Sequence, residues 1–437
     1  MSTPKPPRRR TRPSGLDERN GKAVEKEPEH IFDGTILVIA QDGDLVLRIE
    51  HETASTQHSH DFRVRSKVLR TGSRFFERLV GPSGFGERAQ IEERHRQLEE
   101  LHPGTRLETI AASKLPTVTV KDLGRTGNIK NVQALLADFL NILHDSPSHR
   151  DPPVANLVNL AIVADRFDHL NALRGWQGRK KLLSGIENRT SPKQDAALTE
   201  EKSRQRLLAG LMYEYFPWIE KYSARIIIQG WTTHPDAETD EHFPQWWDLP
   251  MRIEEELAYR RQLALETIQS LQQHHIALFT SRERQCRLGY ENSAQCDSFQ
   301  LGEMIRFFTS RAQTLSILGT ITGEEHCPEP YEGSLYVLLD TLKQIPEYQI
   351  DRYHTHCGIR THFVPLVGLI ETALPKVGVC AECWQESGKE CLWLYRRRPV
   401  LWKRSVGGFT GGRIGHGAGR ARMGEMFAAT QREWSDR

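Results

Sequence analysis

The residues of this chain best suited to chemistry are cysteines and histidines in its C-terminal half. Cys286 and Cys296 lie ten residues apart, and the stretch "HTHCG" adds His354, His356 and Cys357. The His354-x-x-Cys357 spacing lets both side chains reach one ion, whereas the adjacent His356 and Cys357 do so less readily. Four of these side chains form the sulfur and nitrogen ligand set that tetrahedral structural zinc prefers: Cys286, Cys296, His354 and Cys357.

A second candidate zinc site lies nearer the C-terminus. Cys380-x-x-Cys383 is half of a zinc knuckle, and Cys391 follows eight residues later. The stretch "LWLYRRR" comes next, so a fourth ligand has to come from elsewhere, and His356 could supply it. A Cys-x-x-Cys pair can also be redox-active, although no βαβ pattern surrounds this one. The alternative for both sets is ordinary buried thiols, because cysteine is among the most buried residue types.

Motifs of the common enzyme classes are missing from the sequence. It has no glycine-rich phosphate loop, no H-E-x-x-H and no G-x-S-x-G. Two carboxylate groups, Glu92–Glu93 and Glu254–Glu255–Glu256, occur in highly charged helical stretches, which predicts that they face solvent. We therefore expect a protein that is not an enzyme, in which any zinc ion is structural.

The composition predicts an intracellular protein of two or three domains, in the nucleus or the cytoplasm. The 437 residues have a net charge of +2, which gives no overall electrostatic attraction to nucleic acid. No apolar stretch approaches the roughly 20 residues that span a bilayer. No apolar run follows Met1 as in a secretory signal, and the odd number of cysteines, seven, argues against a disulfide framework.

An α+β module is predicted at residues 30–180. Apolar residues alternate in "DLVLRIE" (44–50) and in "DFRVR" (61–65), as in two antiparallel strands joined by the long polar loop "HETASTQHSH". "LPTVTV" (115–120) is a third strand, and the charged segment 81–115 is predicted to be an insertion or a surface helix. Three helical patterns follow, at residues 132–143, 157–167 and 170–173.

The stretch "FRVRSKVLRTGSRFFERLV" (62–80) is either a basic helix that contacts nucleic acid or a helix of the core. Its apolar residues recur at i, i+4, i+7 and i+11, which predicts one amphipathic helix with its charges on the solvent face. Ser66 is the expected N-cap. Phe75 and Phe76 therefore belong to the core, and this element does not read DNA.

This order of elements resembles a BTB/POZ domain. The family pattern D-x-x-L is matched by Asp44 and Leu47, and the pattern F-x-V-x-x-x-x-L-x-x-x-S-x-x-F by Phe62, Val64, Leu69, Ser73 and Phe76. "VQALLADFLNILHD" and "VANLVNLAIVADRFDHLNALRGW" are similar to the later helices of the family, with matches at Asp165, Phe167 and Leu170. Two features depart from it: Arg65–Ser66–Lys67 replaces the usual His, and the insertion 81–115 is unusual.

A mostly α-helical domain is predicted at residues 198–375, followed by a Cys-containing segment at 376–395. Apolar stripes mark helices near residues 207–215, 219–227, 252–279, 301–308, 335–345 and 366–374. "SFQLGEMIRFF", "YEGSLYVLLDTLKQI" and "HTHCGIR" are similar to the helical C-terminal part of a group of filamentous-fungal BTB/POZ proteins. That resemblance implies an architecture and no catalytic chemistry.

Both ends of the chain are predicted to be tails. Residues 1–29 contain the basic cluster "PPRRRTRP" and few apolar residues, as in disordered segments. This cluster is either a nuclear-import or phosphate-contacting arm or simply a solvated tail. Residues 396–437 are rich in glycine and arginine, which predicts a flexible tail. Only these basic tails would contact nucleic acid.

The resemblance implies protein partners, and it leaves more than one function open. The module would self-associate as a homodimer or dock a partner through its apolar surface. A cullin-type ubiquitin-ligase substrate adaptor would bind a cullin in this way. A nuclear transcription or chromatin cofactor would use the arm Lys5–Pro13 for nuclear entry. An enzyme would need convergent polar groups in a pocket, and fold alone does not choose between these functions.

Overall fold

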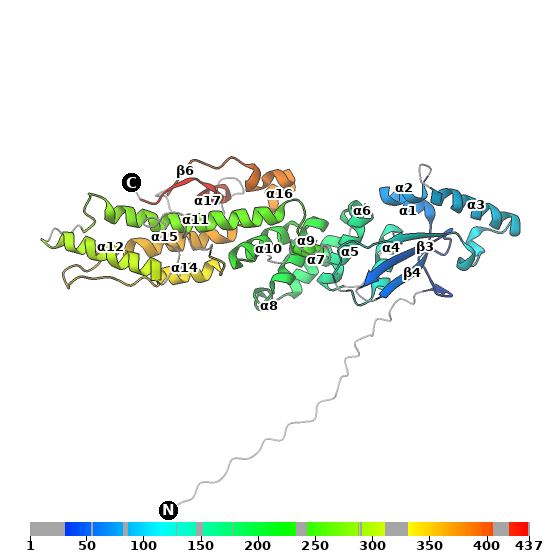
Figure 1. The fold of residues 1–437 in the computed structure, drawn as a ribbon, viewed down its shortest axis with the longest axis horizontal. Coiled ribbons are helices and arrows are strands. Elements are labelled where there is room, and N and C mark those ends of the chain that lie inside the picture. Colours follow the sequence, from blue (N-terminus) through cyan, green and yellow to red (C-terminus); the bar gives the residue numbers. More distant parts are fainter. Residues whose placement is uncertain are drawn as a thin grey trace, which may run out of the picture.

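The computed structural model of the chain describes residues 31–53, 56–81, 86–127, 129–145, 152–176, 178–232, 243–286, 288, 291–310, 331–404 and 419–435. A small sheet with its helices forms one end of the molecule, and a bundle of longer helices forms the other (Figure 1). The predicted α+β class is confirmed. The predicted tail at residues 1–29 lies outside the described residues.

The N-terminal sheet has the strand order β1-β2-β4-β3-β5. Its strands are β1 (Phe32–Asp33), β2 (Ile36–Val38), β3 (Leu45–Thr53), β4 (Thr56–Val64) and β5 (Thr117–Lys121). β3 pairs antiparallel with β4 and parallel with β5. A parallel pair needs a crossover connection, and it is made here by α1 (Ser66–Gly72), α2 (Arg74–Val80) and α3 (Gly86–Leu101).

One face of this sheet is the core of the module. Alternate residues of a strand point to the same face, and the predicted alternation is confirmed by a row of buried side chains: Leu45, Leu47, Ile49, Phe62, Val64, Val118 and Val120. They belong to one apolar cluster with residues of α4 (Val132–Leu143) and α5 (Val154–Arg166).

The predicted long polar loop between β3 and β4 is wrong. Both strands continue into this stretch, β3 as far as Thr53 and β4 from Thr56, and the antiparallel register pairs these two residues. Backbone hydrogen bonds extend a ladder whatever the side chains are, and a polar outer face does not interrupt it. A polar stretch can therefore belong to a strand.

The predicted single helix at residues 66–80 is also wrong, because Ser73 divides it. Ser73 has extended backbone angles (φ −147°, ψ 129°), and its hydroxyl accepts the N–H of Phe76 and donates to the carbonyl of Phe167. Nor is Ser66 an N-cap. Its N–H and hydroxyl donate to Asp44 at 2.7 and 2.6 Å, so that a carboxylate from the strand side holds the start of α1.

The charged segment 81–115 covers the second face of the sheet. Within α3, Ile91 and Leu98 are buried, although most of this helix is exposed. Leu98 joins a small apolar cluster with Ile36 and Val46 of the sheet and Ile110, Ala112 and Leu115 of the segment. The segment therefore contributes to the fold, because it shields Val46, which points away from the main core.

Helices of the second half follow the predicted stripes. The helices α6 (Leu170–Gly175), α7 (Gly178–Arg189) and α8 (Pro192–Ala196) lead into α9 (Glu200–Tyr213), α10 (Phe216–Gln229), α11 (Ile253–Thr280), α12 (Ser293–Ser310), α14 (Leu335–Lys343), α15 (Arg360–Ala373) and α16 (Ala381–Ser387). α11 runs along this domain for 28 residues (Figure 1). Among the described residues no single helix is long and apolar enough to cross a membrane. One bent pair of helical segments, Arg360–Lys376 and Ala381–Cys391, reaches the required length and apolar composition only when the two are taken together.

The sheet module and the helical domain share one apolar core. A single cluster of buried residues extends from Leu37 to Trp434. Within it, the hydroxyl of Tyr213 in α9 donates to the carbonyl of Leu157 in α5 at 2.9 Å, and both residues are buried. The helices on either side of the module boundary therefore pack directly against each other.

The predicted flexible tail at residues 396–437 is wrong for the residues that the structure describes. These residues form β6 (Leu401–Lys403), α17 (Gly419–Ala428) and β7 (Gln431–Glu433). Phe427 and Trp434 are buried, and the Trp434 indole N–H donates to the hydroxyl of Ser270 in α11 at 3.3 Å. Composition predicted disorder, but a few large apolar residues are enough to attach the segment to α11.

Phe76 is the aromatic anchor of the N-terminal module. Its side chain is 0% exposed, and its ring lies 5.4 Å from that of Phe167. Phe75 is half-buried, with the guanidinium of Arg166 above its ring. The prediction that the phenylalanines belong to the core is therefore met fully by Phe76 and in part by Phe75.

Replacing Phe76 tests this assignment. Phe76→Ala is expected to lower the free energy of unfolding of the module by about 3–5 kcal/mol, because it opens a cavity in a closed aromatic cluster. Phe75→Ala in the same helix is the matched control and should cost less. The measurement is urea unfolding of the full chain, followed by circular dichroism. Equal losses in both variants, or no loss in Phe76→Ala, contradict the assignment.

Candidate functional site

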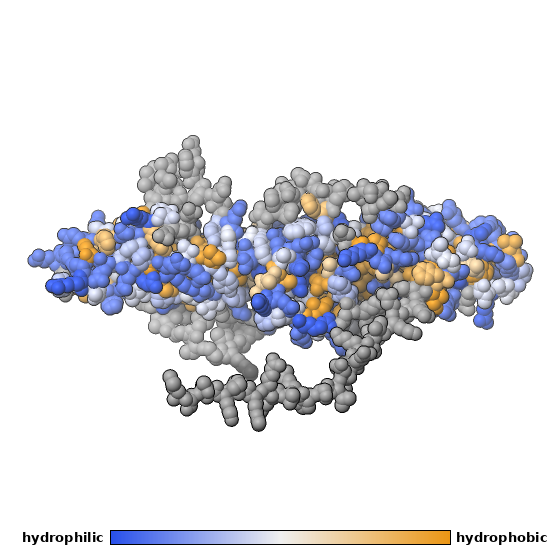
Figure 2. Space-filling view, turned by 90° about the horizontal axis from the view of Figure 1, so that it is seen from below, coloured by the Kyte–Doolittle hydropathy of each residue, from blue (hydrophilic) through white to orange (hydrophobic). Residues whose placement is uncertain are grey.

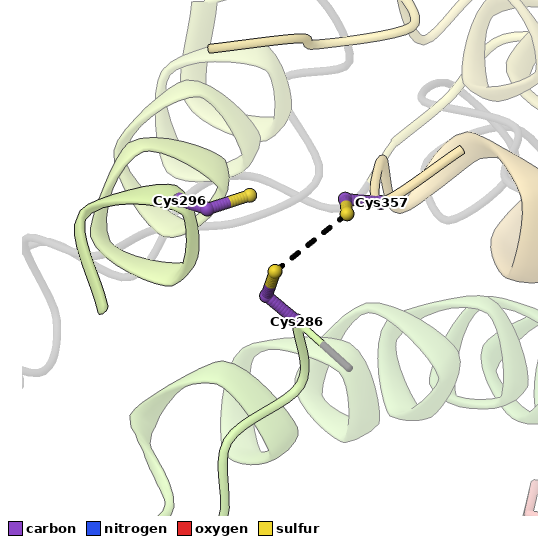
Figure 3. Close-up of side chains that lie close together, drawn as sticks. All are labelled: Cys286, Cys296 and Cys357. Atoms are coloured by element: carbon purple, nitrogen blue, oxygen red, sulfur yellow. Dashed lines mark hydrogen bonds between the residues drawn. The ribbon is translucent and has the colours of Figure 1, made fainter. Parts of the chain in front are cut away.

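Three cysteines from separate segments meet at the end of α11 that points away from the sheet. Cys286 lies in the loop after α11, Cys296 in the first turn of α12, and Cys357 in the loop before α15 (Figure 3). Their sulfur atoms all lie within 4.8 Å of one another, and the Sγ atoms of Cys286 and Cys357 are 3.7 Å apart. The structure thus brings together three of the four residues of the first predicted zinc set.

The fourth residue of that set, His354, is buried beside Cys286. Its Nδ1 lies 2.9 Å from Oδ1 of Asp351. The Asp351 carboxylate raises the pKa of His354, and Cys286 adds to the shift. Backbone geometry closes this loop, because the N–H of Cys357 donates to the carbonyl of His354 at 3.4 Å and His356 adopts a left-handed conformation with φ 65°.

The three thiols differ in how readily they ionise. Burial raises the pKa of Cys296 to about 12 and that of Cys357 to about 11. Burial also opposes ionisation of Cys286, but its hydrogen bond with Ser293, among others, lowers the pKa of this thiol overall. Chemically, such a cluster can hold one soft cation, form a disulfide, or remain a group of buried thiols.

The second predicted set is not assembled in the same way. Cys380 and Cys383 lie at the start of α16, where burial and the neighbouring Cys380 raise the pKa of Cys383. Cys391 is buried, which raises its pKa to about 11. Among the described residues these three sulfurs do not come within ligand distance as a group. His356 does not complete the set, because it lies at the first cluster beside Glu347, with its side chain 81% exposed.

The prediction that Glu254–Glu255–Glu256 faces solvent is wrong for Glu256, which is fully buried. Its carboxylate accepts the Nε–H of Arg260 and the backbone N–H groups of Trp393 and Leu394. The matching prediction for Glu92–Glu93 is confirmed, since both are exposed. A run of charges does not reveal which of its members has a partner far along the chain.

Arg260 completes this buried network. It donates to the carbonyls of Val377 and Gly378, and its guanidinium lies 4.1 Å above the ring of Trp393. A cavity of about 480 Å³ adjoins it. Two arginines of the lining are engaged by carboxylates, Arg260 by Glu256 and Arg398 by Glu266.

Stacked histidines on the β3–β4 hairpin were missed by the sequence analysis. The ring of His51 lies 5.3 Å from that of His58 and 5.5 Å from that of His60. Burial lowers the pKa of His51 and His60, and the neighbouring imidazoles lower it further. The signal was present as His58-x-His60, the period of two that places both rings on one face of a strand.

Comparisons with known proteins identify no relative. No protein-family model matches this chain, and neither a curated protein nor a solved structure matches it. The functional assignment therefore depends on the geometry of the chain itself, and the BTB/POZ resemblance stays a prediction.

The buried network on α11 predicts a large effect of Arg260→Met. The substitution leaves the Glu256 carboxylate buried without its cation, and loss of one partner of a buried pair typically costs about 3–5 kcal/mol. Arg252→Met is the control, because the Arg252–Glu255 pair on the same helix is exposed and should contribute little. Urea unfolding of the helical domain measures both variants. Similar stabilities would show that the buried pair does not hold the C-terminal segment.

The histidine stack predicts that the hairpin is less stable in acid. A histidine whose pKa is lowered by folding takes up its proton more readily when unfolded, so its contribution is complete above pH 6.5 and is lost as the pH falls below that value. The His51→Gln, His60→Gln double variant should therefore lose less stability than the native chain between pH 7 and pH 5. The measurement is urea unfolding across that range. Identical pH profiles would exclude a role for the stack.

Proposed function

We propose that this chain is a non-enzymatic protein–protein interaction protein whose N-terminal module is BTB/POZ-like and associates with a second copy of itself. The element order supports the proposal: a β3–β4 hairpin, the helices α1 and α2, the parallel strand β5, and then α4, α5 and α6. This is the order on which the resemblance was based, and the segment 81–115 is inserted between α2 and β5.

The observation that carries the proposal is the edge strand β1. It has β2 as its only neighbour among the described strands, so no described strand pairs with the other side of its backbone. Two large apolar side chains are exposed there, Ile31 at 54% and Phe32 at 51%. Apolar residues also show over the end of the molecule that carries the sheet (Figure 2). An open strand edge with exposed apolar residues is a typical site for pairing with another strand.

A second copy of the chain fits this edge, because it offers the same strand and the same exposed apolar side chains. Two β1 strands related by a two-fold axis pair antiparallel, and each Phe32 then meets the same apolar surface on the other chain. The pairing buries Ile31 and Phe32 without moving the core, because neither side chain belongs to a buried cluster. Strand addition of this kind needs no change in the sheet.

If the test shows no self-association, two other kinds of partner are the alternatives. A cullin-type adaptor would bind its cullin through this module and a substrate through the helical domain. A transcription or chromatin cofactor would enter the nucleus with the arm Lys5–Pro13, which lies outside the described residues.

The test is the molar mass of the full chain by light scattering over a dilution series. We expect a dimer that dissociates on Phe32→Asp, because this change places a charge at the centre of the paired edge. Val337→Asp is the matched control: Val337 is 59% exposed on α14, and the same charge there should leave the dimer intact.

A monomeric native chain at every concentration would contradict self-association and direct the search to a different partner. A dimer that resists Phe32→Asp but dissociates on Val337→Asp would place the interface on the helical domain. Circular dichroism of both variants checks that the fold is unchanged, which is expected because both side chains are exposed.

A further inference from the structure

We propose that Cys286, Cys296, Cys357 and His354 bind one zinc ion in a tetrahedral site with three sulfur ligands and one nitrogen ligand. This inference goes beyond the proposed function and is independent of it, since it concerns the far end of the helical domain. The supporting observations are the spacing of the sulfur atoms, the orientation of His354 and the hydrogen bonds behind the cluster.

The sulfur spacing matches a tetrahedron around zinc. Zinc–sulfur bonds of about 2.3 Å at tetrahedral angles place two ligand sulfurs about 3.8 Å apart. The Sγ atoms of Cys286 and Cys357 are 3.7 Å apart, and Cys296 Sγ lies within 4.8 Å of both. A disulfide would need about 2.05 Å. The three sulfurs thus surround a point from which each can bind the same ion (Figure 3).

His354, which is buried and interacts with Cys286, is the residue that we assign as the fourth ligand. Asp351 engages Nδ1 at 2.9 Å, so Nε2 is the ring nitrogen that would coordinate. A carboxylate behind a ligating histidine is the usual arrangement at zinc sites, since it orients the ring and makes it a better ligand. Asp351 is itself fixed, because it accepts hydrogen bonds from the side chain of Asn292 and the N–H of Tyr353, both at 2.8 Å.

The backbone around Cys286 is held in the same manner. The carboxylate of Asp297 accepts the N–H of Gln285 at 3.0 Å and that of Cys286 at 2.8 Å. The hydroxyl of Ser293 lies 3.4 Å from the Cys286 sulfur and can donate to it once the thiol has lost its proton to the metal. The proposed ligands and the residues that hydrogen-bond to them therefore come from the same three segments of the chain.

A zinc ion here would join two helical pairs. Cys286 lies in the connection between α11 and α12, and Cys296 lies at the start of α12. His354 and Cys357 lie in the connection between α14 and α15. The loops that carry these ligands have little regular structure of their own, and the ion would supply cross-links that apolar packing does not. The expected role is structural, because all four ligand positions are filled by protein side chains.

The first test is metal content. The full chain, purified with a reducing agent and without chelator, should contain one zinc ion per chain by elemental analysis. Cys357→Ser and Cys296→Ser should lose it. The double variant Cys380→Ser, Cys383→Ser is the matched control and should keep it, since those sulfurs are not grouped at ligand distance.

A second measurement covers ligand variants that fail to fold. Cobalt exchanged into the native chain should give the visible bands of a tetrahedral ion and charge-transfer bands of the strength expected for three thiolates. The Asp351→Asn variant should keep the metal but bind it roughly 10–100-fold more weakly, because Asp351 does not bind the ion itself and only orients His354. A chelator should lower the unfolding temperature of the native chain and not that of Cys357→Ser.

Three results would overturn the proposal. The first is a reduced native chain that contains no zinc and takes up none when zinc is added. The second is zinc that follows Cys380 and Cys383 instead. The third is a disulfide between Cys286 and Cys357 in the freshly isolated chain, detected by mass spectrometry of alkylated peptides. None of these outcomes bears on self-association, which is measured by molar mass.

Discussion

The buried ion pair between Glu256 and Arg260 determines which groups must lie beside α11. Both residues sit on α11, and neither could be removed from water without partners. The partners come from one segment more than a hundred residues later, where Val377 and Gly378 supply carbonyls and Trp393 and Leu394 supply N–H groups. These hydrogen bonds satisfy the buried charges, and they join α11 directly to the C-terminal segment.

The same helix organises the rest of the domain by similar means. Arg204 of α9 pairs with Glu254, and Arg261 donates to carbonyls of α10 and of the segment before α14. Apolar packing supplies most of the stability, but it is not directional. The buried arginines add directional interactions, because the N–H donors of a guanidinium group have fixed geometry and require carbonyls or carboxylates at matching positions. The cysteine cluster lies at the other end of α11. There the proposed zinc ion would fix the relative positions of the segments that carry its ligands.

The two functional proposals concern opposite ends of an elongated molecule. Exposed apolar residues and an open strand edge lie at the sheet end, whereas the cysteines and His354 lie at the far end of α11 (Figure 1). Continuous packing from α5 through α9 and α10 to α11 connects the ends. An association surface at the sheet end would therefore leave the helical domain at the far end of the molecule.

Periodicity was sufficient to predict most of the elements. Alternation located the strands at Leu45–Ile49 and Val118–Val120, and apolar stripes located most helices from α4 to α15, because burial of one face imposes the period of the element on its residues. The same reasoning failed at Ser73, where a hydroxyl finds a partner at Phe167, 94 residues away. It also failed for the polar hairpin and for the C-terminal segment, since composition says nothing about what packs on the other side.

The candidate site divides in the same way. Ligand chemistry and the short His354-x-x-Cys357 spacing were sufficient to single out all four members of the first set, since these depend on residue type and local geometry. Only the tertiary structure could decide that Cys286, Cys296 and Cys357 meet while Cys380, Cys383 and Cys391 do not group at ligand distance. It likewise decided that Glu256 is buried and that Asp351 stands behind His354. The sequence determines which groups each residue offers, whereas the packing of distant helices determines which of those groups come within bonding distance.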